Sequence, residues 1–219
     1  MRRRQFDLVV FDWDGTLMDS AAAIVAAVQG ACVDLGLDVP TEEKARYIIG
    51  LGLADAMRYL LPALPPERYG ALVERYREHY LVRDQTLTLF AGAAELVHGM
   101  HASGTLLAVA TGKSRRGLDR AFALTGLGAF FHSSRCADES KSKPDPAMLI
   151  ELIAELGAEP ARTLMVGDTT HDLQMARAAG VDAVAVTHGS QPREALLAAG
   201  PRACLAGLDE LKAWLEIHG

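Results

Sequence analysis

The sequence has 219 residues, of which 50% are hydrophobic and 6% aromatic, and it carries a formal net charge of −6. The hydrophobic content is sufficient for a packed core and argues against a disordered chain. The negative charge argues against nucleic acid or an anionic membrane as the main partner. A phosphate-binding site in such a chain needs a local source of positive charge.

The N-terminal segment and the cysteines indicate a compartment. Acidic residues interrupt the apolar stretch behind the basic N-terminus, so we expect no signal peptide. No apolar run reaches the about 18 residues that a membrane helix needs. The three cysteines form no C-x-x-C pair, which is typical of a reducing compartment and indicates neither a disulfide framework nor a zinc site. We therefore expect a soluble, cytoplasmic protein, and the sequence does not indicate its oligomeric state.

Short apolar runs alternate with helical patterns along most of the chain. We expect strands at residues 8–11, 106–110, 164–166 and 183–186, and helices at residues 115–124, 147–156 and 173–179. This alternation predicts an α/β fold with a Rossmann-like, doubly wound parallel sheet and helices on both faces. Ligands of such sheets bind at the carboxyl ends of the strands. Gly180 is expected to end the last of these helices.

The segment 20–88 interrupts this alternation. A crossover between parallel strands needs only about a dozen residues, so the much longer segment predicts an inserted domain. Its apolar residues recur at helical spacing, which predicts an insert of roughly four helices. We therefore predict an α/β core domain formed by residues 1–19 and 89–219, and a small helical cap domain at residues 20–88, inserted after the first strand.

Two apolar series and one loop give detail within this insert. Residues 24–35 predict a helix, with Ser20 as its N-cap and Gly36 as the residue that ends it. A tyrosine-rich stripe at residues 69–80 is interpreted as packing between helices. The glycine-containing loop 49–53 either reaches the core site, where it would influence specificity, or simply joins two helices.

Two acidic residues follow the first expected strand. Asp12 and Asp14 are separated by one residue, and Gly15 then allows a sharp turn. Two carboxylates at a strand end suit a metal ion, or a nucleophile with a neighbouring acid or base. A D-x-D pair alone is weak evidence, because many solvent-exposed turns contain one.

The segment 111–114 follows the second expected strand. Thr111 offers a hydroxyl, and the residues after it offer backbone N–H groups, to a phosphate. Its Gly-Lys-Ser tripeptide resembles the end of a P-loop, but that motif requires glycine at position 107, which is leucine. A P-loop is therefore excluded.

Lys143 and a second acidic pair complete the polar clusters. Lys143 directly precedes Pro144, which favours an extended backbone and fixes the direction of the lysine side chain. The alternative is a basic surface loop, and the nearby Lys141, which lacks this restraint, is expected to be solvated. Asp168 follows the strand expected at 164–166, and Asp172 lies four residues further, at a helix start.

The order and spacing of these four clusters strongly resemble the haloacid dehalogenase-like hydrolase superfamily. The pattern D-x-D-G-T-L-x-D-S occupies residues 12–20, and the threonine motif (Thr111), K-P-x-P (143–146) and G-D-x-x-x-D (167–172) follow in family order. The helical insert is similar to the cap of the subgroup that includes phosphoglycolate phosphatases. The resemblance covers essentially the whole chain. Trp13 is a conservative departure, since the family more often has Phe, Met or Leu there.

This resemblance implies roles in catalysis and substrate binding. It implies that Asp12 attacks phosphorus, and that Asp14 protonates the leaving oxygen and later activates water. Thr111, Gly112 and Lys143 are implied to bind the phosphoryl oxygens. The expected partner is therefore a small phosphate ester.

The resemblance also implies a magnesium site. Mg²⁺ is expected to bind Asp12, the backbone carbonyl of Asp14, and Asp168. Asp172 is expected to lie behind these ligands and to orient Lys143 or a metal-bound water. Four carboxylates and one lysine give the site a charge of −3. A phosphate monoester dianion would be repelled by that charge, which is why a divalent cation is needed.

The family resemblance implies a Mg²⁺-dependent phosphatase that hydrolyses a small phosphorylated metabolite, of the phosphoglycolate or sugar-phosphate type, through an aspartyl-phosphate. A phosphosugar mutase similar to β-phosphoglucomutase is the alternative, because the motifs do not determine whether water or substrate accepts the phosphoryl group. Dehalogenases on this scaffold generally lack the residue equivalent to Asp14. A non-catalytic receiver domain is a remote alternative, and it has no place for the insert.

Overall fold

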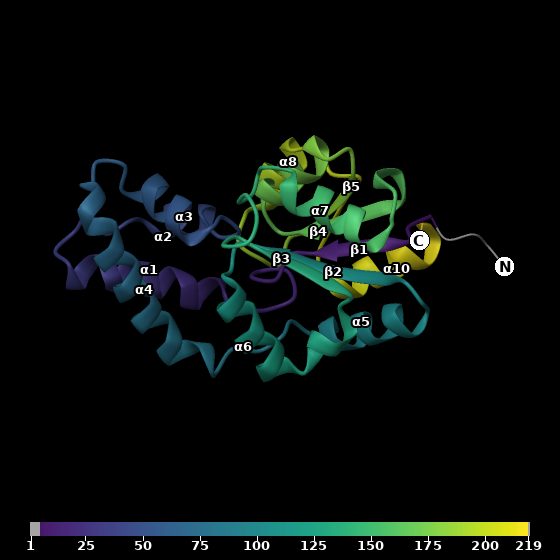
Figure 1. Ribbon diagram of the computed structural model, residues 1–219, viewed down its shortest axis with the longest axis horizontal. Helices are drawn as coiled ribbons and strands as arrows, with labels where there is room; N and C mark the ends of the chain where they lie inside the picture. The colour runs from purple at the N-terminus through teal and green to yellow at the C-terminus, as the bar shows by residue number, and fades with distance from the viewer. Residues whose placement is uncertain (1–4, 219) are drawn as a thin grey trace.

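The computed structural model describes residues 5–218, and its strands form one parallel six-stranded sheet (Figure 1). The strands are β1 (Leu8–Phe11), β2 (Leu106–Thr111), β3 (Ser133–Cys136), β4 (Thr163–Gly167), β5 (Asp182–Val186) and β6 (Ala203–Leu205). Their order in the sheet is β3-β2-β1-β4-β5-β6. The chain therefore winds outward from β1 in both directions, first to β2 and β3 and later to β4, β5 and β6.

Helices connect the strands and also form the insert. The α-helices are α1 (Ala21–Asp34), α2 (Glu42–Tyr47), α3 (Leu53–Leu60), α4 (Tyr69–Asp84), α5 (Ala93–Ala102), α6 (Arg115–Thr125), α7 (Ala147–Leu156), α8 (Thr170–Ala178), α9 (Arg193–Ala198) and α10 (Leu208–His218). Short 3-10 helices are η1 (Pro66–Arg68), η2 (Leu127–Phe130) and η3 (Pro160–Arg162). Within residues 5–218, none of these helices combines the length and the apolar character that spanning a bilayer requires.

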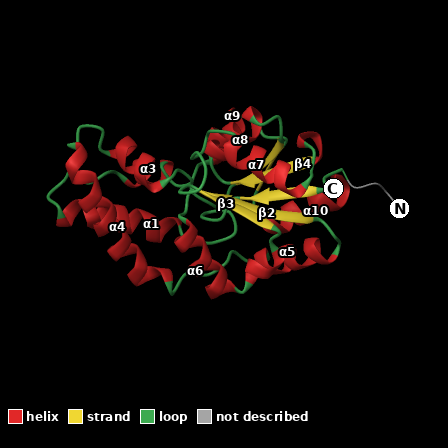
Figure 2. Cartoon of the chain, in the orientation of Figure 1, coloured by secondary structure: helices red, strands yellow, loops and turns green. Residues whose placement is uncertain are grey.

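Helices cover both faces of the sheet (Figure 2). Successive side chains of a strand point to opposite faces. Val9 and Phe11 accordingly pack with α5, α6 and α10, whereas Leu8 and Val10 pack with α7 and α8. A sheet buried on both faces needs continuous apolar strands, which is why the inner strands are readable in the sequence. The predicted doubly wound α/β fold is confirmed.

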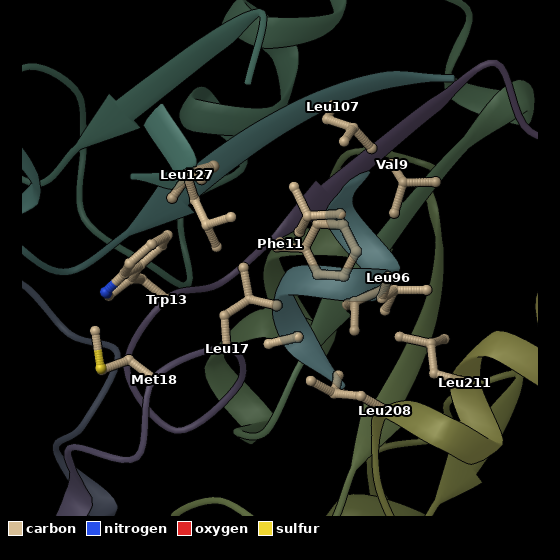
Figure 3. Close-up of a cluster of buried hydrophobic side chains, with 14 of the residues drawn as sticks. Val9, Phe11, Trp13, Leu17, Met18, Leu96, Leu107, Leu127, Leu208 and Leu211 are labelled. Carbon is tan, nitrogen blue, oxygen red and sulfur yellow. The ribbon is translucent and has the colours of Figure 1, made fainter. Parts of the chain in front are cut away.

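The core on the α5 side extends to the turn after β1. Figure 3 shows Phe11, Trp13 and Leu17 together in this buried cluster. The Trp13 side chain is fully buried and meets Phe122 edge to face, with 5.3 Å between ring centroids. Its indole N–H has no hydrogen-bond partner among the described residues. Trp13 therefore anchors this turn in the core through apolar contacts alone.

The elements differ from the sequence predictions in identifiable places. The four predicted strands are present, with ends that agree to within one residue. Strands β3 and β6, the two edge strands of the sheet, were missed, because β3 reads Ser-Ser-Arg-Cys and β6 has only three residues. Helix α8 begins three residues before its predicted start, because Thr169 caps it. Helices α5, α9 and α10 were not predicted.

The insert contains the four α-helices α1 to α4, which Figure 1 shows beside the carboxyl ends of the strands. They share a hydrophobic core of their own that includes Val28, Met57 and Leu72. The tyrosine-rich stripe on α4 contributes to it and to a neighbouring cluster around Tyr80, so it packs between helices as interpreted. We propose residues 20–88 as the extent of this cap domain.

One predicted cap is wrong. Ser20 occupies the N-cap position of α1, but its side chain accepts no hydrogen bond from the helix. Its backbone has ψ of −6°, outside the extended region that favours capping, and its hydroxyl donates to Asp14 Oδ1 at 2.6 Å. The predicted glycine ends are present, since Gly36 and Gly180 have φ of 61° and 69° after α1 and α8.

Candidate active site

The four polar clusters meet at the carboxyl edge of the sheet. Strand β1 pairs with both β2 and β4, and Asp12 N extends the ladder by donating to Val166 O at 2.9 Å. Thr111 ends β2, Asp168 follows β4, and Lys143 lies in the loop after β3. All four of these functional candidates are buried.

Lys143 connects two of the carboxylates. Its Nζ lies 2.8 Å from Asp12 Oδ1 and 2.6 Å from Asp172 Oδ1. Burial alone would lower the pKa of Lys143, but the two carboxylates outweigh it and raise this pKa above its usual value. The buried ammonium group therefore remains charged across the physiological pH range.

Asp172 uses both of its oxygens within the protein. Oδ1 accepts from Lys143 Nζ, and Oδ2 accepts from Thr169 N at 3.1 Å and from Thr169 Oγ1 at 2.6 Å. The contact with Thr169 is half of a capping box at the start of α8. Asp172 thus contacts Lys143 from a position fixed by the helix N-terminus.

Asp12 and Asp168 form the acidic part of the site with Asp172. Oxygens of the three buried carboxylates lie within 4.8 Å of one another. Burial raises the pKa of Asp12 well above its usual range, although Lys143 opposes this rise. Burial and the nearby Asp172 raise the pKa of Asp168 to about 7. Uncompensated negative charge is concentrated here.

This acidic cluster fits a small divalent cation. Asp12 Oδ2 is buried and has no hydrogen bond among the described residues. Asp168 is held in place by Thr16 Oγ1 at 2.8 Å and by Ser190 N at 2.7 Å. Carboxylate oxygens are the ligands that Mg²⁺ prefers. Asp12 has a free oxygen, and each Asp168 oxygen accepts one hydrogen bond, whereas Asp172 pairs with Lys143 and accepts two hydrogen bonds at Oδ2. Asp12 and Asp168 are therefore the better candidate ligands.

Asp14 lies in a separate group of contacts. Its Oδ1 accepts from Ser20 Oγ at 2.6 Å and lies 3.0 Å from Lys113 Nζ. Lys113 in turn donates to the hydroxyl of Tyr80, on α4 of the insert, at 2.8 Å. The sequence predicted Ser20 only as a helix N-cap, and it assigned neither Ser20 nor Lys113 a role in the site. The available signal for Lys113 was its position two residues after Thr111. When Lys113 is counted with the four carboxylates and Lys143, the charge of the site changes from −3 to −2.

The loop 49–53 reaches the core site, which decides between the two alternatives left open by the sequence. A Cβ atom on Gly112 would lie 2.4 Å from Leu51 O and 2.6 Å from Gly50 O. Gly52 N also donates to Ser142 Oγ at 2.7 Å, next to Lys143. The loop backbone therefore packs directly on the strand ends.

The C-terminal half of the core also contacts the insert. His171 Nε2 lies 2.8 Å from Tyr47 O, and Gln191 Nε2 donates to the same oxygen at 3.4 Å. Burial lowers the pKa of His171, so the ring is neutral at physiological pH. Thr16 belongs to the first motif but was given no role, and sequence motifs gave no signal for Ser190 or Gln191, because the partners of these residues are remote in the chain.

Residues 9–186 match the family of haloacid dehalogenase-like hydrolases. The chain belongs to this family. A probable phosphatase named IndB from Dickeya dadantii is 37% identical over 212 residues, covering 93% of this chain and 91% of the relative. The N-acetylmuramic acid 6-phosphate phosphatase of Pseudomonas aeruginosa is 31% identical, covering 86% and 85%. The phosphoglycolate phosphatase of Synechococcus elongatus is 30% identical, covering 88% and 89%.

Solved structures share the fold of this hydrolase. A hydrolase from Pseudomonas syringae superimposes with a TM-score of 0.88 at 23% identity, covering 96% of this chain and 99% of that chain. A putative β-phosphoglucomutase from Bacteroides vulgatus has a TM-score of 0.86 at 21% identity, covering 99% and 91%. At this identity the similarity concerns the fold alone.

A cavity of about 620 Å³ lies between the insert and the core of the hydrolase. Its walls come from the loop 49–53, from α3 and α4 of the insert, and from the start of α6. Asp14 and Lys113 both line it. A small organic molecule can therefore sit next to Asp14, on the side of the site that faces the insert.

Gly112→Ala tests the contact between the loop and the strand ends. The added methyl would overlap two backbone carbonyls of the loop, which cannot yield as a side chain would. We expect kcat/KM to fall by up to about 100-fold, as for an ångström-scale displacement in an active site, with unchanged far-UV circular dichroism. Gly99→Ala in α5, where the added methyl meets open space, is the matched control. Wild-type kcat/KM in Gly112→Ala would contradict this packing.

Proposed function

We propose that this hydrolase is a phosphatase that acts on a small phosphate ester through an aspartyl-phosphate on Asp12. The observation that carries the proposal is the state of Asp12: it is buried, held by Lys143 at 2.8 Å, and has a second oxygen free of hydrogen bonds. A free carboxylate oxygen at the carboxyl edge of the sheet suits a nucleophile. The phosphatase names of the relatives support the same activity.

In the first step, a carboxylate oxygen of Asp12 forms a bond to phosphorus while the ester oxygen leaves. Lys143 and Thr111 bind the phosphoryl oxygens, where negative charge is concentrated during transfer. Asp14 gives its proton to the leaving oxygen, so the alcohol departs neutral. In the second step, Asp14 takes a proton from water, which attacks phosphorus and releases inorganic phosphate from Asp12.

Mg²⁺ is the cofactor proposed for this reaction. Asp12, Asp168 and the backbone carbonyl of Asp14 would hold it, and Asp172 would orient Lys143 behind them. When bound, the ion neutralises part of the carboxylate charge that otherwise repels a phosphate dianion. The relatives act on different phosphate esters according to their names, and phosphoglycolate and sugar phosphates are our proposed substrate types.

A panel of phosphate esters, assayed with Mg²⁺ and with excess chelator, tests the activity. We expect phosphate release that requires Mg²⁺ and is abolished in Asp12→Asn, because an amide cannot form an acyl phosphate. Calcium should substitute poorly, since its looser coordination disturbs in-line attack. Full activity in chelator, or Asp12→Asn activity within about tenfold of the wild type, would overturn the mechanism. An isomerised sugar phosphate in place of free phosphate would identify a mutase.

Trapping with a slowly hydrolysed substrate tests the nucleophile directly. Rapid quenching in acid followed by peptide mapping should place the phosphoryl group on Asp12, because its Oδ2 is free of hydrogen bonds. The label should be lost at alkaline pH, as expected for an acyl phosphate. A label on Asp14 or on a serine would contradict the assignment.

Lys143→Ala and Lys141→Ala form a matched pair. Lys143 is 2% exposed and pairs with two carboxylates, whereas the Lys141 side chain is 76% exposed and lies 3.6 Å from Asp145. We expect Lys143→Ala to lose about 3–4 kcal/mol of transition-state stabilisation in kcat/KM. Lys141→Ala should change little. Thermal unfolding confirms that each variant is folded at the assay temperature. Loss of activity in Lys141→Ala alone would mean that the motif is misaligned.

A further inference from the structure

The proposed mechanism leaves one lysine of the site, the half-buried Lys113, without a function. Lys143 lies beside Asp12, where the phosphoryl group binds, whereas Lys113 lies beside Asp14, with 3.0 Å between Nζ and Oδ1. If Asp14 protonates the leaving oxygen, the alcohol part of the substrate must lie near Lys113. The two lysines therefore face the two halves of a phosphate ester.

Lys113 is a charged group with an unused donor. Burial alone would lower the pKa of Lys113, but the neighbouring Asp14 outweighs it and raises this pKa. An ammonium group has three N–H donors. Among the described residues, the side chain of Lys113 has only Asp14 and the hydroxyl of Tyr80 as polar partners. Burial raises the pKa of Tyr80, so the phenol stays neutral and adds no negative charge.

The cavity around Lys113 is lined by more positive than negative side chains. The basic residues are Lys113, Arg77, Arg116 and Arg120, and the acidic residues are Asp14, Asp55 and Asp138. Asp55 already pairs with Arg58 at 3.1 Å, and Arg120 pairs with Asp84 at 3.1 Å; neither partner lines the cavity, so these two pairs cancel and an excess of one positive charge remains. Within residues 5–218, the cavity-lining side chains of Arg77 and Arg116 make no hydrogen bond and no ion pair. In a chain of net charge −6, this local excess favours an anionic ligand.

We propose that Lys113 binds a negatively charged group on the alcohol part of the substrate. The preferred substrates are then phosphate esters whose leaving group carries a second anion, either a carboxylate or another phosphate. This inference rests on the proposed function, because the role of Asp14 places the leaving group in the cavity. Lys113 is a specificity residue in this scheme, while Lys143 serves every phosphate ester alike.

A matched series of esters tests the proposal. We would measure kcat/KM for phosphate esters of hydroxycarboxylic acids of increasing chain length, for their uncharged primary amides, and for bisphosphates of the corresponding diols. The wild type should prefer an anionic ester over its amide by about 10- to 100-fold at one chain length, the usual effect of a hydrogen bond to a charged group. The chain length with the highest kcat/KM shows how far the second anion lies from the ester oxygen. Comparison with the bisphosphates shows whether the preferred second anion is a carboxylate or a phosphate.

Variants assign this preference to Lys113. Lys113→Met and Lys113→Gln should bring the ratio of anionic ester to amide close to one, mainly through KM. Lys113→Arg, which keeps the charge, should retain part of the preference. Lys141→Met is the matched control, because it removes an exposed lysine that does not line the cavity.

Each outcome bears on the proposal. Equal kcat/KM for charged and amide esters in the wild type, which requires no variant, would overturn it while leaving the phosphatase intact. If Lys113→Met lowered kcat/KM equally for the anionic esters and for the uncharged amides, the proposal would also be overturned, because Lys113 would then only position Asp14. Failure of the wild type to release phosphate from any ester would instead refute the proposed function, and this inference with it.

Discussion

The concentration of buried carboxylates at one sheet edge is the constraint to which the surrounding structure responds. Two like charges roughly 4 Å apart repel by on the order of 4 kcal/mol at an effective dielectric of about 20. Oxygens of Asp12, Asp168 and Asp172 approach one another within 4.8 Å, and among residues 5–218 Lys143 is the one cation that pairs with two of these carboxylates. Such a cluster persists only where every available hydrogen-bond donor is directed to it.

Local features of the chain provide those donors. The capping box of α8 directs two donors of Thr169 to Asp172, and Ser190 N reaches Asp168 from the loop after β5. Gly15 makes the tight approach of this loop possible, because its φ is 86° and a Cβ atom there would lie 2.2 Å from Asp168 Oδ2. The charge that remains unbalanced is what prepares the site for a cation.

The sequence predicted the parts of the fold and site that depend on local pattern. Inner strands buried on both faces are continuous apolar runs, so β1 and β4 were evident, whereas the polar β3 was not. Asp12 and Asp168 were proposed as site residues because each follows a predicted strand within a recognisable motif, and Lys143 because it precedes Pro144 in the K-P-x-P motif. Lys113 was missed as a site residue, because its importance depends on Tyr80, which the fold of the insert brings to it from a distant part of the chain.

The contacts between insert and core divide the site into a part shaped by backbone atoms and a part lined by side chains. Backbone atoms of loop 49–53 pack on Gly112, so this part of the interface holds its shape independently of side-chain identity. The side of the cavity next to Asp14, in contrast, is lined by side chains from α4 and α6. Substitutions there can change what fits beside Asp14 without moving the residues that surround Asp12.

The position of Trp13 also gives the protein an internal optical probe. The chain has two tryptophans, and Trp13 stands between the proposed nucleophile and the proposed acid. Its indole is sealed in an apolar environment without a hydrogen bond, so its emission is expected at short wavelength. Trp214 lies on α10, where it stacks on Phe6. Figure 1 shows that helix at the end of the sheet away from the insert, so a fluorescence change on ligand binding would report mainly on the turn that carries Asp12 and Asp14.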